Sequence, residues 1–209
     1  MKNPFRAGSR VYLRPLEPED AATLQPWAND PEVTRHVLIS RPMTLADESA
    51  FVERMRTSER DVALAIVLRR GDRLIGATSL HPGPGYNRSA MFGILIGEKR
   101  EWGRGYGTEA TGLIVDHGFE TMNLHRIWLH VVSYNARAIR AYEKVGFRQE
   151  GVLRQETYRE GRYWDTIAMA ILREEWEARR EGGEPRVPAS RHRVPAREAA
   201  GRTSRARNR

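Results

Sequence analysis

The spacing of apolar residues predicts two helices near the start of the chain. Apolar side chains recur at helical spacing over residues 18–29 and again over residues 45–58. A short stretch at residues 10–16 precedes them and predicts a strand. Thr44 and Asp47 have the spacing of a capping box, with Asp in the place of the usual Glu, so the second helix is expected to begin directly after Thr44.

Segments that favour strands follow these helices. Aliphatic and β-branched residues gather at 62–68, 74–80 and 90–96. Turn-forming residues separate them, as Arg-Gly-Asp at 70–72 and as His-Pro-Gly-Pro-Gly at 81–85. Because turns this short connect neighbouring antiparallel strands, we expect the three segments to form a meander.

The second half of the chain alternates between helical and strand patterns. The expected order is a helix at 106–120, a strand at 126–132, a helix at 136–145, and strands at 149–158 and 163–172. A short turn around Gly161 connects the last two strands. This interleaving predicts an α/β (α+β) protein with a mixed sheet and flanking helices.

Length and composition narrow the class of protein. A chain of 209 residues is long enough for one domain with a sizeable core and needs no disulfides to hold it. Cysteine is absent, which excludes a disulfide scaffold, thiolate zinc sites and a cysteine nucleophile. The longest apolar run, residues 62–68, is far shorter than the ~20 residues of a membrane-spanning helix. We therefore expect a soluble, cytoplasmic protein without membrane contact.

Positive charge gathers at the C-terminal end. The formal net charge is +8, and residues 181–209 contribute +5 of it through eight arginines and three glutamates. This segment has three prolines and no aromatic residue, so it is expected to be a disordered basic tail behind one domain at residues 1–180. The tail also raises an alternative class, a non-catalytic protein that docks on RNA or the ribosome, or an enzyme brought there by its tail.

A glycine-rich loop before the helix at 106–120 carries the clearest functional signal. Gly103, Gly105 and Gly107 leave room for a ligand to approach the backbone closely. The unpaired N–H groups of the helix's first turn point at whatever lies there, because they have no partner within the helix. The loop is therefore a predicted anion site, such as one for a pyrophosphate.

Two common phosphate-binding motifs do not match this loop. A Walker loop requires Gly-x4-Gly-Lys-Ser/Thr, and no lysine stands at the required place. Residues 105–110 match the dinucleotide pattern Gly-x-Gly-x-x-Gly/Ala, but residues 97–104 separate them from the preceding strand. The acidic residue expected about 20 positions later is also missing. A nicotinamide oxidoreductase is therefore only a remote alternative.

Two motifs resemble those of the GNAT family of N-acetyltransferases. Residues 100–105, Arg-Glu-Trp-Gly-Arg-Gly, fit the family's pyrophosphate loop, Gln/Arg-x-x-Gly-x-Gly/Ala. Residues 135–147 follow Asn-x-x-Ala-x-x-x-Tyr-x-x-x-Gly-Phe at every named position. The string from Trp102 to Ala110 is similar to the branch that contains ribosomal-protein-alanine, spermidine and amino-sugar acetyltransferases. The resemblance implies a splayed, mostly antiparallel sheet.

The resemblance also implies a reaction, the direct transfer of an acetyl group from acetyl-CoA to a primary amine. Tyr142 is then expected to protonate the departing thiolate, and Asn135 to cap its helix and contact the pantetheine arm. An amine attacks only when neutral, so a base must take its proton. His130, on the strand at 126–132, and Glu98, beside the loop, are the candidates. A main-chain N–H near Ile96 is expected to meet the oxyanion where the strands splay.

The expected acetyl-CoA contacts come from the strand end, the loop and the second motif. They are Leu95, Ile96, Trp102, Gly103, Arg104, Gly105, Tyr106, Gly107, Thr108, Asn135, Ala138 and Tyr142. No spacing of His, Asp and Glu indicates a metal site, so no metal is expected.

The acceptor is left open among a protein N-terminus, a polyamine and other small amines. Acidic residues outside the two motifs are expected to attract a cationic amine: Asp30, Glu32, Glu150, Glu156 and Glu160. Among proteins similar in this way dimers are common, so a homodimer is a further hypothesis.

Overall fold

An eight-stranded sheet forms the centre of the computed structural model, which describes residues 1–37 and 39–182. Its strands lie in the order β1-β2-β3-β4-β5-β6-β8-β7. Their bounds are β1 Arg6–Ala7, β2 Val11–Pro15, β3 Val62–Leu68, β4 Arg73–Pro82, β5 Ser89–Ile96, β6 Arg126–Val132, β7 Arg148–Arg159 and β8 Arg162–Leu172. The α-helices are α1 Ala21–Asn29, α2 Pro31–Thr34, α3 Leu45–Thr57, α4 Tyr106–Glu120, α5 Ala136–Val145 and α6 Arg173–Arg180.

The sheet opens into a fork between β5 and β6. These two strands are the parallel pair, and they pair only from Ser89 to Met91 on β5 and from Arg126 to Trp128 on β6. Beyond these residues β5 continues along β4, and β6 continues along β8. The other neighbouring strands are antiparallel. The mixed, mostly antiparallel and splayed sheet implied by the resemblance is confirmed.

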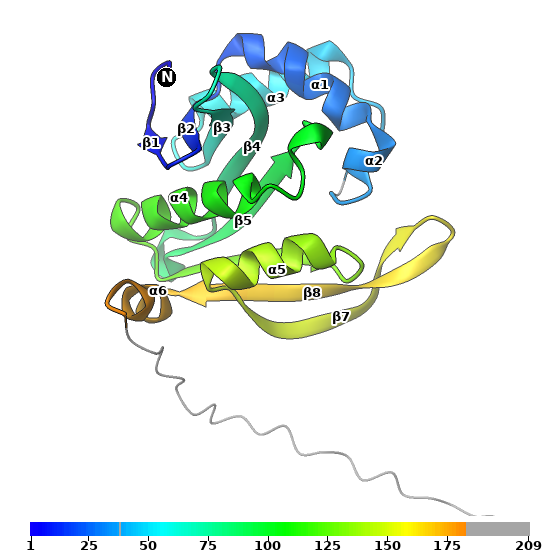
Figure 1. Cartoon of the computed structure of the whole chain (residues 1–209). Helices are drawn as coiled ribbons and strands as arrows, with labels where there is room; N and C mark the ends of the chain where they lie inside the picture. Colours follow the sequence, from blue (N-terminus) through cyan, green and yellow to red (C-terminus); the bar gives the residue numbers. More distant parts are fainter. Residues whose placement is uncertain (38, 183–209) are drawn as a thin grey trace, which may run out of the picture.

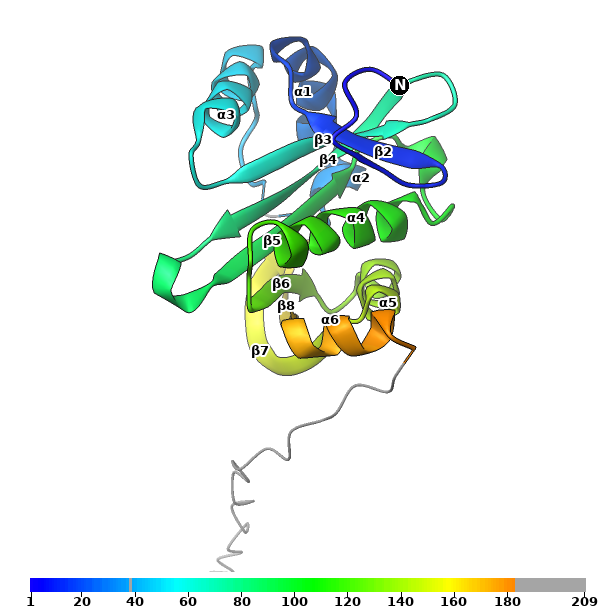
Figure 2. The ribbon, with the colours of Figure 1, turned by 90° about the vertical axis from the view of Figure 1, so that its left-hand side faces the viewer.

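Helices cover both faces of the sheet and enclose two apolar clusters. On one face α4 and α5 lie side by side (Figure 1), and the sheet residues beneath them include Leu80, Phe92 and Leu129. On the other face α1 and α3 pack over β2 and β3, around Tyr12 and Ala65 (Figure 2). Alternate residues of β2 and β3 therefore face different helices, as the two-residue period of a strand requires.

Most expected elements are confirmed, and some boundaries are corrected. The helix expected from residue 18 begins at Ala21, after a short 3-10 helix, η1, at Pro18–Asp20. The carboxylate of Asp20 is buried and accepts two hydrogen bonds of 2.7 Å from Arg14, which fixes this turn against the sheet. Further 3-10 helices lie at Gly85–Asn87 (η2) and Lys99–Glu101 (η3). Three other elements were not expected: β1, α2 and α6.

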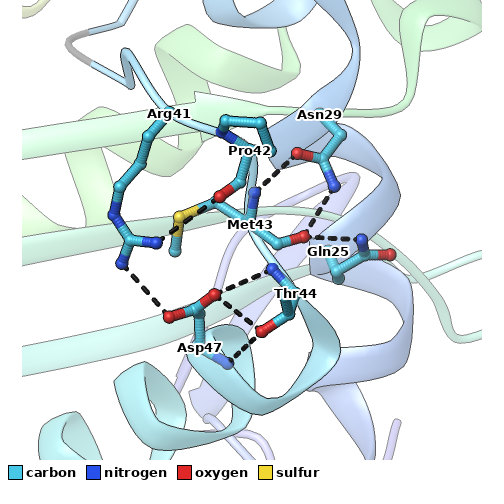
Figure 3. A network of polar contacts seen from close by, with 7 residues as sticks. All are labelled: Gln25, Asn29, Arg41, Pro42, Met43, Thr44 and Asp47. Atoms are coloured by element: carbon cyan, nitrogen blue, oxygen red, sulfur yellow. Dashed lines mark hydrogen bonds and ion pairs between the residues drawn. The ribbon is translucent and has the colours of Figure 1, made fainter.

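Polar contacts fix the residues directly before α3 (Figure 3). Gln25 and Asn29 of α1 both donate to the carbonyl oxygen of Met43, at 2.8 and 2.7 Å. Thr44 and Asp47 form the expected capping box, with Thr44 Oγ1 accepting from the Asp47 N–H at 3.1 Å. These bonds fix Met43 against α1 and Thr44 against the first turn of α3.

Two further expectations concern membrane spans and the C-terminal segment. None of the helices in the described ranges combines the length and the apolar character that a membrane span requires. The expected disorder of residues 181–209 falls almost wholly outside the described residues.

Candidate active site

The glycine loop folds into a turn that only glycine adopts easily. Gly103 and Gly105 have positive φ angles of +76° and +82°, in the left-handed region that costs other residues free energy. Gly105 caps α4, whose first internal bond runs from the Glu109 N–H to the Gly105 carbonyl. The N–H groups of residues 106–108 therefore stay free for a ligand at the helix's positive end.

Side chains hold this loop against the sheet. Trp102 donates its indole N–H to the carbonyl of Ile96, the last residue of β5, at 2.7 Å. Arg10 donates to the carbonyl of Arg104 at 2.8 Å and to the Glu109 carboxylate at 2.9 Å. The loop is thus bonded to Ile96 at the end of β5 and to Arg10 directly before β2, so the loop is shaped before any ligand arrives.

The second motif forms α5 and packs its partly buried tyrosine against the core. Asn135 caps the helix, accepting from the Ala138 N–H at 3.2 Å, and Gly146 ends it with a φ of +118°. The ring of Tyr142 packs edge-on against Phe92, with 5.8 Å between the centroids. Burial alone raises the pKa of Tyr142 to about 12, so the hydroxyl keeps its proton at every working pH.

A cavity of about 410 Å³ joins these features. It runs from the glycine loop and the start of α4, past the end of β5, to α5 and to residues 31–37, which form the α2 corner. Of the residues expected to contact acetyl-CoA, all line this cavity except Arg104, which pairs with Glu101 at 3.3 Å. These residues line one cavity, and their contacts with acetyl-CoA stay a prediction.

The two expected bases do not line this cavity. His130 is exposed, and its neighbours in β6, Leu129 and Val131, face α4 and α5, so its own side chain lies on the other face of the sheet. Its ring packs against Trp128 at 5.3 Å between centroids. Glu98 caps the short helix η3 and pairs with Arg73 at 3.2 Å. The catalytic roles of both residues stay predictions without support from the cavity's geometry.

A histidine from outside both motifs does line the cavity. His36 lies two residues after the end of α2, and Val33 and Val37 of the same corner line the cavity with it. Sequence reasoning missed this corner, because a four-residue helix leaves no periodic signal. Arg137, Arg140 and Lys144 of α5 add positive charge to the cavity wall.

Most of the acidic residues expected to attract a cationic amine are neutralised by ion pairs. Lys99 pairs with Asp30 at 2.7 Å and with Glu32 at 2.9 Å, and its hydrogen bond lowers the pKa of Asp30. Glu160 pairs with Arg35 at 3.1 Å, and Glu150 receives both arms of Arg126. The exception among the five is Glu156, which has no ion pair with another described residue.

The described residues contain no group of three or more His, Asp or Glu side chains that could hold a metal ion.

Comparisons with known proteins agree with this geometry. A family model described as the acetyltransferase (GNAT) domain matches residues 10–148. The spermidine N(1)-acetyltransferase of Vibrio cholerae is 30% identical to the chain, over 83% of this chain and 99% of the relative. A candidate ribosomal N-acetyltransferase of Bacillus subtilis, YdaF, is 26% identical over 82% of this chain and 96% of its own.

A solved structure has the same fold. The spermidine N-acetyltransferase from Vibrio cholerae in complex with CoA and spermine aligns with a TM-score of 0.74 at 27% identity, covering 81% of this chain and 99% of that one. The resemblance read from the two motifs is therefore confirmed by sequence and by structure.

Proposed function

The chain belongs to the GNAT family of acetyltransferases and uses acetyl-CoA as its co-substrate, and from this premise we propose that it acetylates a primary amine directly, with Tyr142 as the proton donor. The observation that carries the proposal is the single cavity lined by the glycine loop, Asn135 and Tyr142. In this proposal the loop holds the pyrophosphate and the fork admits the pantetheine arm, so the thioester lies close to Tyr142.

The chemistry asks little of the protein beyond position and proton transfer. The amine attacks the thioester carbonyl, and the developing oxyanion is met by a main-chain N–H near Ile96, where β5 has left β6. The C–S bond then breaks, and the sulfur takes a proton from Tyr142. Because burial keeps this hydroxyl protonated, a donor is present at every turnover.

For the acceptor we propose an amine with one positive charge, such as a protein or peptide N-terminus, rather than a polyamine. A polyamine needs several uncompensated carboxylates, and four of the five acidic residues expected to attract a cationic amine are paired with Lys99, Arg35 and Arg126. An α-amine also has a pKa near about 8, two units below that of a lysine-like amine, so it is more easily neutral.

Spermidine is the rival acceptor, because the relatives named above include spermidine acetyltransferases. The test is the rate of thiol release from acetyl-CoA with two matched acceptor sets, short peptides with free α-amines and the polyamines spermidine and spermine. We expect a higher kcat/KM for peptides. A higher kcat/KM for polyamines contradicts the proposed acceptor but leaves the acetyltransferase itself intact.

We also propose that the basic tail contacts RNA or the ribosome. Residues 181–209 carry a net charge of +5, which supports a contact of this chain with RNA or the ribosome, either as an enzyme brought there by its tail or as a non-catalytic binding protein. Deleting the tail is expected to weaken RNA binding and its salt dependence while leaving turnover unchanged. An unchanged affinity for RNA contradicts the tail contact.

We also propose that the chain forms a homodimer, which light scattering of the full chain tests.

A further inference from the structure

Among the described residues that line the cavity, His36 is the only histidine. It belongs to neither motif, and the proposed function gives it no task. The cavity brings it to the same wall as Ile96 and Tyr142, although it stands 60 residues or more from both in the chain. An imidazole there has the chemistry of a proton acceptor near neutral pH.

The backbone around His36 is held on several sides. Its own N–H donates to the Val33 carbonyl at 3.3 Å. The Tyr134 hydroxyl donates to the Arg35 carbonyl, and Arg159 donates to the Val37 carbonyl at 3.3 Å. These bonds tie the α2 corner to the β6–α5 loop and to the β7–β8 hairpin, which extends beneath α2 in Figure 1. The imidazole is thus presented to the cavity by a fixed scaffold.

Two aromatic rings fix the plane of the imidazole. The centroid of His36 lies 6.1 Å from that of Trp102, with the rings at 71°, and 5.9 Å from that of Tyr134. Nδ1 is buried and has no hydrogen-bond partner among the described residues. Nε2 is therefore the nitrogen available to accept a proton. In the tautomer that leaves the lone pair on Nε2, the ring hydrogen is already on Nδ1. Protonation at Nε2 then adds no further buried N–H group.

The surroundings keep this imidazole neutral. Burial lowers the pKa of His36, and Arg137 on α5 and Arg35 in the same corner lower it further. The charged and titratable groups that face it are Arg35 and Glu32 from its own corner, Arg137 from α5, Glu160 from the β7–β8 hairpin and Tyr134 from the β6–α5 loop. Glu32 and Glu160 oppose the shift, and both are paired with cations. A neutral imidazole is the form that accepts a proton.

We propose that His36, rather than His130 or Glu98, is the catalytic proton acceptor of acetyl transfer, taking the amine proton directly or through one water. This inference rests on the proposed function. It differs from the sequence-based expectation because a base must share the cavity with the thioester, and of these three residues only His36 lines it.

The step balances without any further reactant. The amine lone pair forms the N–C bond, and the nitrogen, now cationic, passes one proton to Nε2 of His36. The C–S bond breaks with its electron pair on sulfur, which takes the proton of Tyr142. His36 then releases its proton to solvent and Tyr142 recovers one, so both side chains return to their starting states.

The test compares the pH dependence of kcat/KM for a peptide acceptor in the wild type, His36→Ala and His130→Ala, from about pH 5 to about pH 9. Below the pKa of the acceptor amine, the ionisation of that amine alone gives a slope of one in a plot of log(kcat/KM) against pH. For the wild type we expect the slope to rise to two below the ordinary histidine pKa of about 6.5. His36→Ala is expected to lose this second break and about 100-fold in kcat, with the KM for acetyl-CoA unchanged.

Chemical rescue separates catalysis from packing. Free imidazole is expected to restore part of the kcat of His36→Ala, whereas a ring that only packs between Trp102 and Tyr134 is not replaced in this way. An unchanged pH profile in His36→Ala, or loss of the second break in His130→Ala instead, overturns the inference. A wild type that binds acetyl-CoA but acetylates no amine refutes the proposed function, and this inference with it.

Discussion

Trp102 donates its indole N–H to the carbonyl oxygen of Ile96 over 2.7 Å, which ties the glycine loop to the residue where β5 ends beside the fork. The guanidinium of Arg137 lies over the same indole, 4.2 Å from its centroid. One side chain thus connects the expected phosphate site, the expected thioester site and α5. The distance between the expected pyrophosphate and thioester sites is therefore set by the folded chain itself.

Gly105→Ala is expected to weaken both the fold and the binding of acetyl-CoA. The φ of +82° costs a residue with a Cβ about 1–2 kcal/mol, and the new Cβ would lie 3.2 Å from the Arg10 guanidinium. Urea unfolding and the KM for acetyl-CoA are the measurements. Gly112→Ala in the same helix is the control, because nothing lies within 4 Å of its Cβ; it should be neutral or stabilising by up to about 1 kcal/mol. Equal effects of the two variants would refute this prediction.

Asn135 is expected to serve both the helix and the cofactor, and two variants separate the roles. Asn135→Ala loses the cap on α5 and about 1 kcal/mol of unfolding free energy. Asn135→Asp keeps an acceptor for the Ala138 N–H and stays near the wild type in stability, but it loses the amide's N–H donor. A higher KM for acetyl-CoA in Asn135→Asp supports the pantetheine contact, and an unchanged KM leaves Asn135 as a cap only.

The elements with a clear period were predictable, since helical spacing and strand runs are local signals. Three elements have the bounds in the structure that the sequence predicts: α4 at 106–120, β6 at 126–132 and α5 at 136–145. The glycine loop and the Asn135 cap were predictable for the same reason, because each acts through its own neighbours.

The α2 corner could not be predicted in this way. His36 reaches the cavity through bonds made by Tyr134 and Arg159, residues about 100 or more positions further along the chain. Strand alternation places the side chain of the expected base, His130, on the other face of the sheet, because its neighbours Leu129 and Val131 take the face toward α4 and α5. Its catalytic role stays a prediction. The ion pairs of Asp30 and Glu32 likewise depend on a lysine, Lys99, that only the fold brings near.

A buried histidine is expected to make stability depend on pH. His117 is 5% exposed, and burial, followed by the nearby Arg6, lowers its pKa. Between the unfolded value of about 6.5 and this lower folded value, the unfolded chain binds more protons, so the free energy of unfolding falls as the pH falls.

His117→Gln should reduce the slope of that free energy with pH by up to about 1.4 kcal/mol per unit in this window. Urea unfolding at a series of pH values measures it. His125→Gln, an exposed histidine, is the control and should leave the slope as in the wild type. The same slope in all three proteins would rule out the buried imidazole as its source.

Lys99→Gln is expected to shift acceptor preference toward polyamines. Its removal leaves Asp30 and Glu32 unpaired beside the α2 corner, where their charge can attract a polycation. We expect a several-fold rise in kcat/KM for spermidine relative to a peptide acceptor, fading at high salt as the charges are screened. Lys2→Gln, whose side chain pairs with neither Asp30 nor Glu32, should leave the ratio unchanged. An unchanged ratio in Lys99→Gln would argue against acceptor selection by paired carboxylates.

Acetyl transfer with Tyr142 as the proton donor is tested most directly by the rate of thiol release from acetyl-CoA. The rate is compared between the wild type and Tyr142→Phe at a saturating concentration of the peptide acceptor. We predict a fall in kcat of about 100-fold or more, with the midpoint shift of thermal unfolding by acetyl-CoA preserved. An unaltered kcat in Tyr142→Phe, with the fold and the midpoint shift intact, would contradict this account.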